Sequence, residues 1–254
     1  MTEEVRRKDR GGVTWLTVAR EAKLNVLNSP MIAALNGHLK DLSGQAGLRA
    51  VVLTGAGDRA FVGGADIGEM AALDEASASD FITRLHGVMT AVRDLPVPVI
   101  ARIDGYCLGG GMELAAACDI RISSDRAKFG MPEARVGLPS VIEATLLPGL
   151  IGWGRCRWLL MTGEVIDAPT AHAWGFVEFM TAPGDLDGTL DETLAAITAA
   201  GPHAVATQKK IMRSWEAMAP DDAAEATIPV FAGSFRTGEP QAMLGAFVKS
   251  KQKK

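Results

Sequence analysis

Apolar and polar residues alternate along the first half of the chain in short runs, and helix-like runs separate them. Alternation is typical of strands, and apolar residues spaced three and four apart are typical of helices. Strands alternating with helices indicate an α/β protein. The strand-like runs are 12–20 (GVTWLTVAR), 49–57 (RAVVLTGAG), 96–105 (PVPVIARIDG) and 119–125 (DIRISSD), and the helix-like runs are 29–45, 78–95 and 111–119.

The pattern changes toward the C-terminus, where helical runs replace the alternation from about Pro169 onward. The clearest of these runs are 190–200, 203–218 and 240–251. We therefore expect an α/β core over residues 1–195 and a helical C-terminal region over 196–254. At the start of the first helical run, Ser29 is the expected N-cap, because Pro30 suits the first helical position.

Composition narrows the class of protein. The chain has 254 residues, of which 48% are hydrophobic and 22% charged, as in ordinary globular proteins. A net charge of -4 gives no basic surface for nucleic acid. The sequence has no apolar run of the ~20 residues that a membrane span needs, and its three cysteines form no C-x-x-C pair. We expect a cytoplasmic protein with reduced cysteines and with neither nucleic acid nor membrane as a partner.

Three consecutive glycines, Gly109 to Gly111, separate a strand end from a helix start in DGYCLGGGMELA. The free N–H groups of a helix start favour a bound anion or a developing oxyanion. A dinucleotide fingerprint would need a further glycine at the right spacing, and the lysine of a phosphate-binding loop is also missing. A tight strand-to-helix junction without a ligand explains this segment equally well.

A second glycine-rich turn, RAFVGGADIGEM (59–70), also follows a strand and leads into a helical run. If the two turns face each other, the N–H groups of Ala65 and Gly110 can hold one carbonyl oxygen. Such an oxyanion hole stabilises the charge of a transition state by roughly 3 to 4 kcal/mol per donor. The structural alternative is that Gly63 and Gly64 only make a turn and that Asp66 is an acid at a helix start.

Several separated motifs together resemble the enoyl-CoA hydratase/isomerase family, also called the crotonase superfamily. They are NVLNSPMIAAL, AFVGGADIGEM and IDGYCLGGGMELAAACDIRISSDRAKFGMPEARVGL, and the resemblance extends over nearly the whole chain. It implies an α/β, crotonase-like spiral of ββα units with a helical C-terminal trimerisation region. It also implies acyl-coenzyme A thioesters as substrates, with coenzyme A as part of the substrate and no permanently bound cofactor.

The resemblance places the oxyanion donors on Ala65 and Gly110 and the two glutamates of the family's hydratases on Glu113 and Glu133. Adding water to a 2-enoyl thioester needs a base for the water and an acid for C2, which two carboxylates in different environments can supply. Glu113 is the expected base and Glu133 the expected acid, although the two can share these roles. The structural alternatives are that Glu113 is an acidic residue favoured at the start of a helix and that Glu133 is an exposed carboxylate in a turn.

One segment departs from the family pattern. The family's hydratases usually carry a Pro-Gly-x-Gly-Gly-Thr run where this chain has PSVIEATLLPGLIG (139–152), and only Thr145 stays in register. Val141, Ile142 and Glu143 replace small residues there and are expected to reshape the acyl pocket. Glu143 as a third carboxylate would allow a dehydratase, hydrolase or isomerase reaction, but a first-turn helix acid is the preferred interpretation.

The resemblance also implies residues that contact coenzyme A and the acyl chain. In a homotrimer, or a dimer of trimers, Phe247 and Lys249 of one subunit would reach the substrate of its neighbour. Met70 and Leu73 are expected to line the acyl pocket. The remaining expected contacts are Lys23, Gly63, Gly64, Ala65, Asp66, Ile67 and Gly109.

Two other classes of function stay open. The basic tail FVKSKQKK (247–254) would suit an RNA-binding or scaffold protein built on a hydratase fold, and a decarboxylase could use the same enolate. No metal is expected, because the histidines share no metal-ligand spacing and are interpreted as surface or boundary residues. These histidines are His38, His86, His172 and His203.

Overall fold

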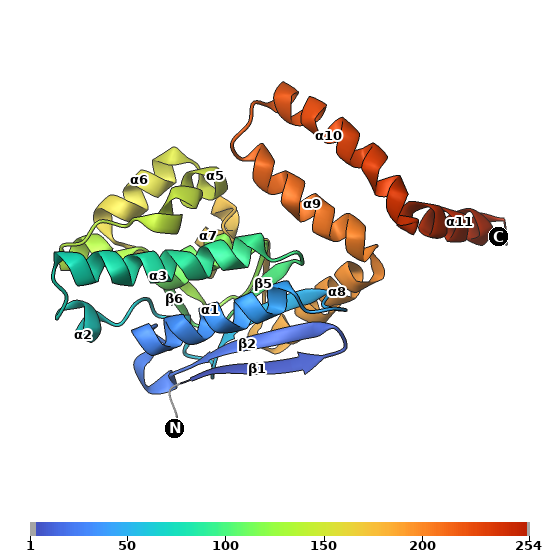
Figure 1. Ribbon diagram of the computed structural model, residues 1–254. Coiled ribbons are helices and arrows are strands. Elements are labelled where there is room, and N and C mark those ends of the chain that lie inside the picture. Colours follow the sequence, from blue (N-terminus) through green and yellow to red (C-terminus); the bar gives the residue numbers. More distant parts are fainter. Residues whose placement is uncertain (1–3, 253–254) are drawn as a thin grey trace.

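The computed structural model describes residues 4–252 and consists of two β-sheets covered by helices, with the C-terminal helices extending away from them (Figure 1). The strands are β1 (Glu4–Arg10), β2 (Val13–Ala19), β3 (Ala50–Gly55), β4 (Ala60–Val62), β5 (Val99–Ile103), β6 (Tyr106–Leu108), β7 (Ile120–Ser124), β8 (Lys128–Gly130), β9 (Val165–Asp167) and β10 (Phe179–Thr181).

Helices connect these strands and form the whole C-terminal part of the described chain. The α-helices are α1 (Ser29–Ser43), α2 (Ile67–Met70), α3 (Glu75–Asp94), α4 (Gly110–Ala117), α5 (Leu147–Ile151), α6 (Trp153–Thr162), α7 (Ala168–Trp174), α8 (Leu186–Ala199), α9 (Pro202–Trp215), α10 (Pro220–Ser234) and α11 (Glu239–Lys251). Short 3-10 helices are η1 (Glu21–Lys23), η2 (Pro132–Val136), η3 (Ile142–Leu146), η4 (Pro183–Asp185) and η5 (Phe235–Thr237).

The larger sheet has the strand order β1-β2-β3-β5-β7-β10 and is parallel except for the β1–β2 pair. Both of its faces are covered, so β3 is buried along its whole length. Helices α1 and α3 lie side by side over one face (Figure 1). On the other face, Leu186, Leu190 and Leu194 of α8 pack with Val52 and Ile100.

The smaller sheet has the order β4-β6-β8-β9, in which β4, β6 and β8 are parallel. Along the chain, three strands of the larger sheet are each followed by a strand of the smaller sheet and then by helical structure: β3, β4 and α2 with α3; β5, β6 and α4; β7, β8 and η2. The spiral of ββα units that the family resemblance implied is therefore present.

The long elements lie where the sequence pattern predicted them. Strands β2, β3, β5 and β7 and helices α1, α3, α8, α9 and α11 are confirmed, whereas β1 and α10 were not predicted. Ser29 as the N-cap of α1 is wrong: Asn28, one residue earlier, accepts the Met31 N–H at 3.1 Å. Both residue types cap helices well, so the sequence alone did not separate them.

The C-terminal helices α9, α10 and α11 project from the α/β core, and α11 lies at the far end (Figure 1). The division expected between residues 195 and 196 falls inside α8, which packs on the larger sheet. Within residues 4–252, the structure has no helix that is both long and apolar enough to cross a bilayer.

Candidate active site

Three loops meet at one edge of the smaller sheet. They follow the carboxyl ends of the parallel strands β4, β6 and β8, and carry Gly63 to Asp66, Gly109 to Gly110, and Met131 to Glu133. Because parallel strands end at the same edge, residues far apart in sequence are brought together there. This edge is where the residues proposed from the sequence converge.

Two backbone N–H groups lie side by side at this edge. A methyl group placed on Gly110 would lie 3.8 Å from the Ala65 nitrogen. Beside Ala65, Leu27 donates to Gly64 O and accepts from the Asp66 N–H, both at 2.8 Å, so the Ala65 N–H faces the opposite side. Gly110 is the first residue of α4, where N–H groups have no intrahelical partner. Over the described chain, neither N–H donates to a protein acceptor.

The glycine run is required by close packing of α4 against β4. Gly109 has φ +51°, a left-handed conformation that favours glycine, and Gly111 would place a methyl group 2.0 Å from the Val62 carbonyl oxygen. All residues of α4 are buried. The helix start is therefore fixed in the interior, with the Gly110 N–H beside Ala65.

Glu113, one turn into α4, is a buried carboxylate with only 4% exposure. Its Oε1 accepts the Ala144 N–H at 3.1 Å. Burial, together with the nearby charges of Glu133 and Glu143, raises the pKa of Glu113 to about 8, although the Ala144 N–H acts in the opposite direction. Near neutral pH this carboxyl group therefore exchanges protons readily.

Glu133 lies in η2, on the loop after β8, and extends over the start of α4. A methyl group on Gly109 would come within 2.6 Å of its Oε1, and the Ser140 hydroxyl donates to its Oε2 at 2.9 Å. Burial raises the pKa of Glu133, while a backbone N–H and the Ser140 hydroxyl lower it. Among residues 4–252, no lysine, arginine or histidine forms an ion pair with Glu113 or Glu133.

A cavity of about 650 Å³ contains both carboxylates and both glycine turns. Most of the remaining lining is apolar. The predicted residues Met70, Leu73 and Val141 line it. Three apolar residues of α3 also line the cavity and were not predicted: Phe81, Ile82 and Leu85. Their spacing on one face of a helix could have indicated them.

Glu143 does not belong to this lining. It lies in the first turn of η3, is 3% exposed, and its Oε1 is 3.0 Å from Nδ1 of His86 on α3. His86 was interpreted from the sequence as a surface or boundary histidine. Its pairing with a buried carboxylate joins segments 57 residues apart.

The residues expected to bind coenzyme A are divided between the cavity and distant surfaces. Gly63, Gly64, Ala65, Ile67 and Gly109 line the cavity. Lys23 is exposed on η1, and the next residue, Leu24, accepts the Gly63 N–H at 2.8 Å, so η1 lies beside the glycine turn.

Two further groups expected at the coenzyme are arranged differently. The Asp66 carboxylate is engaged within the fold, because it caps α2 through the Gly68 N–H and pairs with Arg20 at 2.5 Å. Phe247 and Lys249 are exposed on α11, which lies far from α2 and α3, the helices that contribute to the cavity (Figure 1). The last two residues of the basic tail lie outside the described residues.

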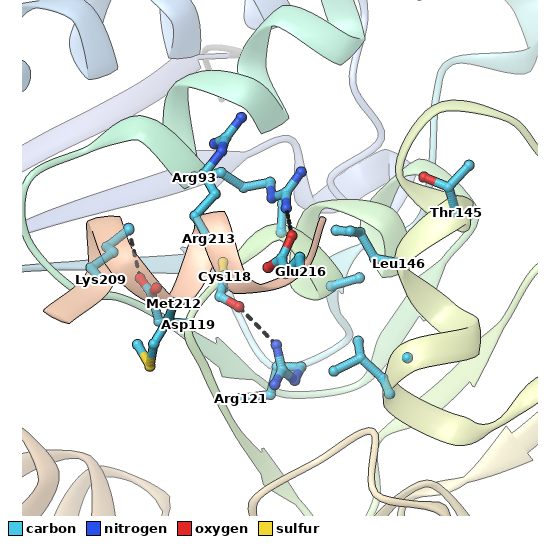
Figure 2. Close-up of a pocket in the computed structure, with 14 residues that line it drawn as sticks. Arg93, Cys118, Asp119, Arg121, Thr145, Leu146, Lys209, Met212, Arg213 and Glu216 are labelled. Atoms are coloured by element: carbon cyan, nitrogen blue, oxygen red, sulfur yellow. Dashed lines mark hydrogen bonds and ion pairs between the residues drawn. The ribbon is translucent and has the colours of Figure 1, made fainter. Parts of the chain in front are cut away.

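A second cavity of about 570 Å³ lies between the core and α9. Its charged side chains each have a partner of opposite charge, either within the lining or just outside it, where Glu178 pairs with Arg121 and Asp94 with Arg213. Figure 2 shows Lys209 pointing toward Asp119, at 2.7 Å, and Arg121 toward the Cys118 carbonyl, at 2.8 Å. Arg93 of α3 also pairs with Glu216. Because these charges are compensated, we interpret this cavity as a structural junction.

Comparisons with known proteins agree with this geometry. The enoyl-CoA hydratase/isomerase family model matches residues 8–254. The short-chain-enoyl-CoA hydratase of Clostridium acetobutylicum is 32% identical over 243 residues, 95% of this chain and 93% of that protein. The carnitinyl-CoA dehydratase of Salmonella arizonae is 32% identical over 223 residues, 87% and 85% of the two chains.

Among solved structures, the enoyl-CoA hydratase from Bacillus anthracis superposes with a TM-score of 0.93 at 31% identity, covering 97% of this chain and 96% of that one. The shared fold and the family match place the chain in one class of α/β proteins, the crotonase-like enzymes. The chain belongs to the enoyl-CoA hydratase/isomerase family, whose members act on coenzyme A thioesters.

Proposed function

We propose that the protein is an enoyl-CoA hydratase, which adds water across the 2,3 double bond of a 2-enoyl-CoA thioester. One observation carries the proposal: Glu113 and Glu133 line the same cavity as the Ala65 and Gly110 turns and have no basic partner among residues 4–252. Both carboxyl groups have a raised pKa, as acids and bases of catalysis at neutral pH require.

The thioester oxygen would accept the N–H groups of Ala65 and Gly110. Electron density then moves from the double bond toward this oxygen, so that C3 becomes electrophilic and the transition state has enolate character. Two fixed donors in a water-poor cavity stabilise this charge by roughly 3 to 4 kcal/mol each. The same donors would serve any family reaction that passes through an enolate.

The carboxylates would then supply the proton transfers. Glu113, whose ionised form accepts the Ala144 N–H, takes a proton from the water that attacks C3. Glu133, in its protonated form, gives a proton to C2. Because the charge of Glu133 is among the causes that raise the pKa of Glu113, the two titrate as a coupled pair and can exchange these roles.

The rest of the substrate has a corresponding surface. The acyl chain would lie along the apolar wall formed by Met70, Leu73 and α3, and coenzyme A is carried as part of the substrate. Lys23 and the Gly63 to Ile67 turn are proposed to contact the coenzyme, with Phe247 and Lys249 contributed by a neighbour in a homotrimer. The relatives named hydratase and dehydratase favour water addition or its reversal over an isomerase.

The direct test is product analysis after incubation of crotonyl-CoA in D2O containing 18O-labelled water. A hydratase places one 18O at C3 and one deuterium at C2 of a 3-hydroxyacyl-CoA. Movement of the double bond without 18O uptake would identify an isomerase instead, and 18O in a free carboxylic acid would identify a hydrolase. Glu192→Gln, on the exposed surface of α8, is the control variant.

A further inference from the structure

The turn that begins η3 has an unusual backbone. Ile142 has φ +35°, in the left-handed region, where a β-branched side chain is a genuine outlier. Such a conformation persists only where surrounding contacts fix it, and it occurs most often at functional sites. The contacts that fix this turn therefore call for an explanation.

Glu143 supplies one of these contacts. Its carboxylate is 3% exposed, and its two oxygens lie 3.0 and 3.1 Å from Nδ1 of His86, whose side chain is half exposed on α3. Of the other helices packed against η3, α4 contributes Glu113 as its sole titratable residue and α5 contributes none. Glu143 is thus buried near a second carboxylate, and His86 is its side-chain hydrogen-bonding partner.

Ala144, the next residue of the same turn, donates its N–H to Oε1 of Glu113 at 3.1 Å. Any shift of this turn would move the donor that holds the Glu113 carboxylate. We propose that Glu143 and His86 form a positioning pair, which anchors the turn to α3 and thereby fixes Glu113 in the cavity. The inference rests on the proposed role of Glu113.

The pair acts on charge as well as on position. The negative charge of Glu143 is one of the causes that raise the pKa of Glu113. An apolar residue at position 143 could fill the same volume without this repulsion, so packing alone does not account for a carboxylate there. Removal of this charge would shift the titration of Glu113, and release of the turn would change kcat, so the two parts of the proposal can be tested separately.

The experiment compares wild type with Glu143→Gln, His86→Ala and His86→Asn, with His38→Gln on α1 as the matched histidine control. The readouts are kcat and KM for crotonyl-CoA hydration and the carboxyl 13C titration of Glu113, identified by its loss in Glu113→Gln. Glu143→Gln is expected to lower the titration midpoint of Glu113, because a like charge is removed.

His86→Ala is expected to lower kcat about tenfold with KM within about twofold, since it releases the turn without entering the cavity. His86→Asn, which keeps a donor near the Nδ1 position, should restore most of the rate. An unchanged Glu113 titration in Glu143→Gln together with wild-type kcat in His86→Ala would overturn the proposal. If wild type hydrates no enoyl-CoA, the proposed function fails, whereas the 13C titration still decides whether the pair acts on Glu113.

Discussion

The two cavities of the molecule differ in whether their buried charged side chains have partners of opposite charge. Beside α9, Asp119 pairs with Lys209 at 2.7 Å (Figure 2), and Arg121 and Arg213 pair with Glu178 and Asp94. At the edge of the smaller sheet, Glu113 and Glu133 share a cavity and no base compensates them among residues 4–252. Uncompensated carboxylates are costly to bury, so their presence indicates chemistry, whereas the compensated pairs beside α9 indicate structure.

The largest expected effect follows from removing one uncompensated carboxylate. Glu113→Gln and Glu133→Gln should each lower kcat for hydration by roughly 10²- to 10⁴-fold, as loss of a general acid or base does. Chemical denaturation should show a free energy of unfolding equal to or above that of wild type, because no buried partner is left unpaired. Loss of stability in parallel with activity would make these glutamates structural, and Glu192→Gln should change neither quantity.

Substitutions of two neighbouring glycines should distinguish a catalytic effect from a structural one. Gly110→Ala should lower kcat by about 10²- to 10³-fold, because its methyl group would lie 3.8 Å from the Ala65 nitrogen, in the space of the thioester oxygen. Gly111→Ala should instead destabilise the fold by at least about 3 kcal/mol, since its methyl group would overlap Val62 O. Steady-state kinetics and denaturation of both variants measure the contrast. Equal loss of stability in the two would contradict it.

Substitutions in the cavity beside α9 should change the free energy of unfolding and leave catalysis unchanged. Asp119→Ala leaves Lys209, which is 7% exposed, as an unpaired buried charge and should cost about 3 kcal/mol in the free energy of unfolding. Glu164→Ala breaks an exposed pair with Arg135 and should cost less than about 1 kcal/mol. Urea denaturation measures both values. An unchanged free energy of unfolding in Asp119→Ala would show that the pairing contributes little to stability.

The smallest effect is a dependence of stability on pH. The folded-state pKa of Glu113 is about 8, against an ordinary value of 4.5, so the folded protein keeps a proton that the unfolded chain releases. The stability from this proton is complete below about pH 4.5 and is lost as pH rises through about 8. The unfolding free energy of Glu113→Gln relative to wild type should therefore rise by roughly 2 kcal/mol from pH 6 to pH 8. A difference independent of pH would contradict the raised pKa.

The sequence pattern predicted the larger sheet better than the smaller one. Strands such as β2 are seven residues long and display their alternation, whereas β4, β6 and β8 have three residues each and too few positions for a period. Strand β1 was missed for another reason: it lies at a sheet edge and most of its side chains are exposed and polar. The ββα spiral came from the family resemblance and not from periodicity.

The residues of the candidate site also differ in whether the sequence could predict them. Glu113, Glu133, Ala65 and Gly110 lie in motifs whose spacing is readable, and the structure brings them to one cavity edge. The Ala144 N–H left no signal in the sequence, because any residue but proline supplies it. His86 and Glu143 meet only through the packing of η3 against α3, so their pairing depends on tertiary structure.

The measurement that tests the central claim most directly is a double-mutant cycle on kcat for crotonyl-CoA hydration, using wild type, Glu113→Gln, Glu133→Gln and the double variant. Residues that act as a unit show strongly non-additive losses. The account predicts that the double variant is about as slow as the slower single variant. Losses that multiply, or a wild type that binds acyl-CoA without consuming the conjugated thioester, would contradict the claim that the two uncompensated carboxylates act together on one substrate.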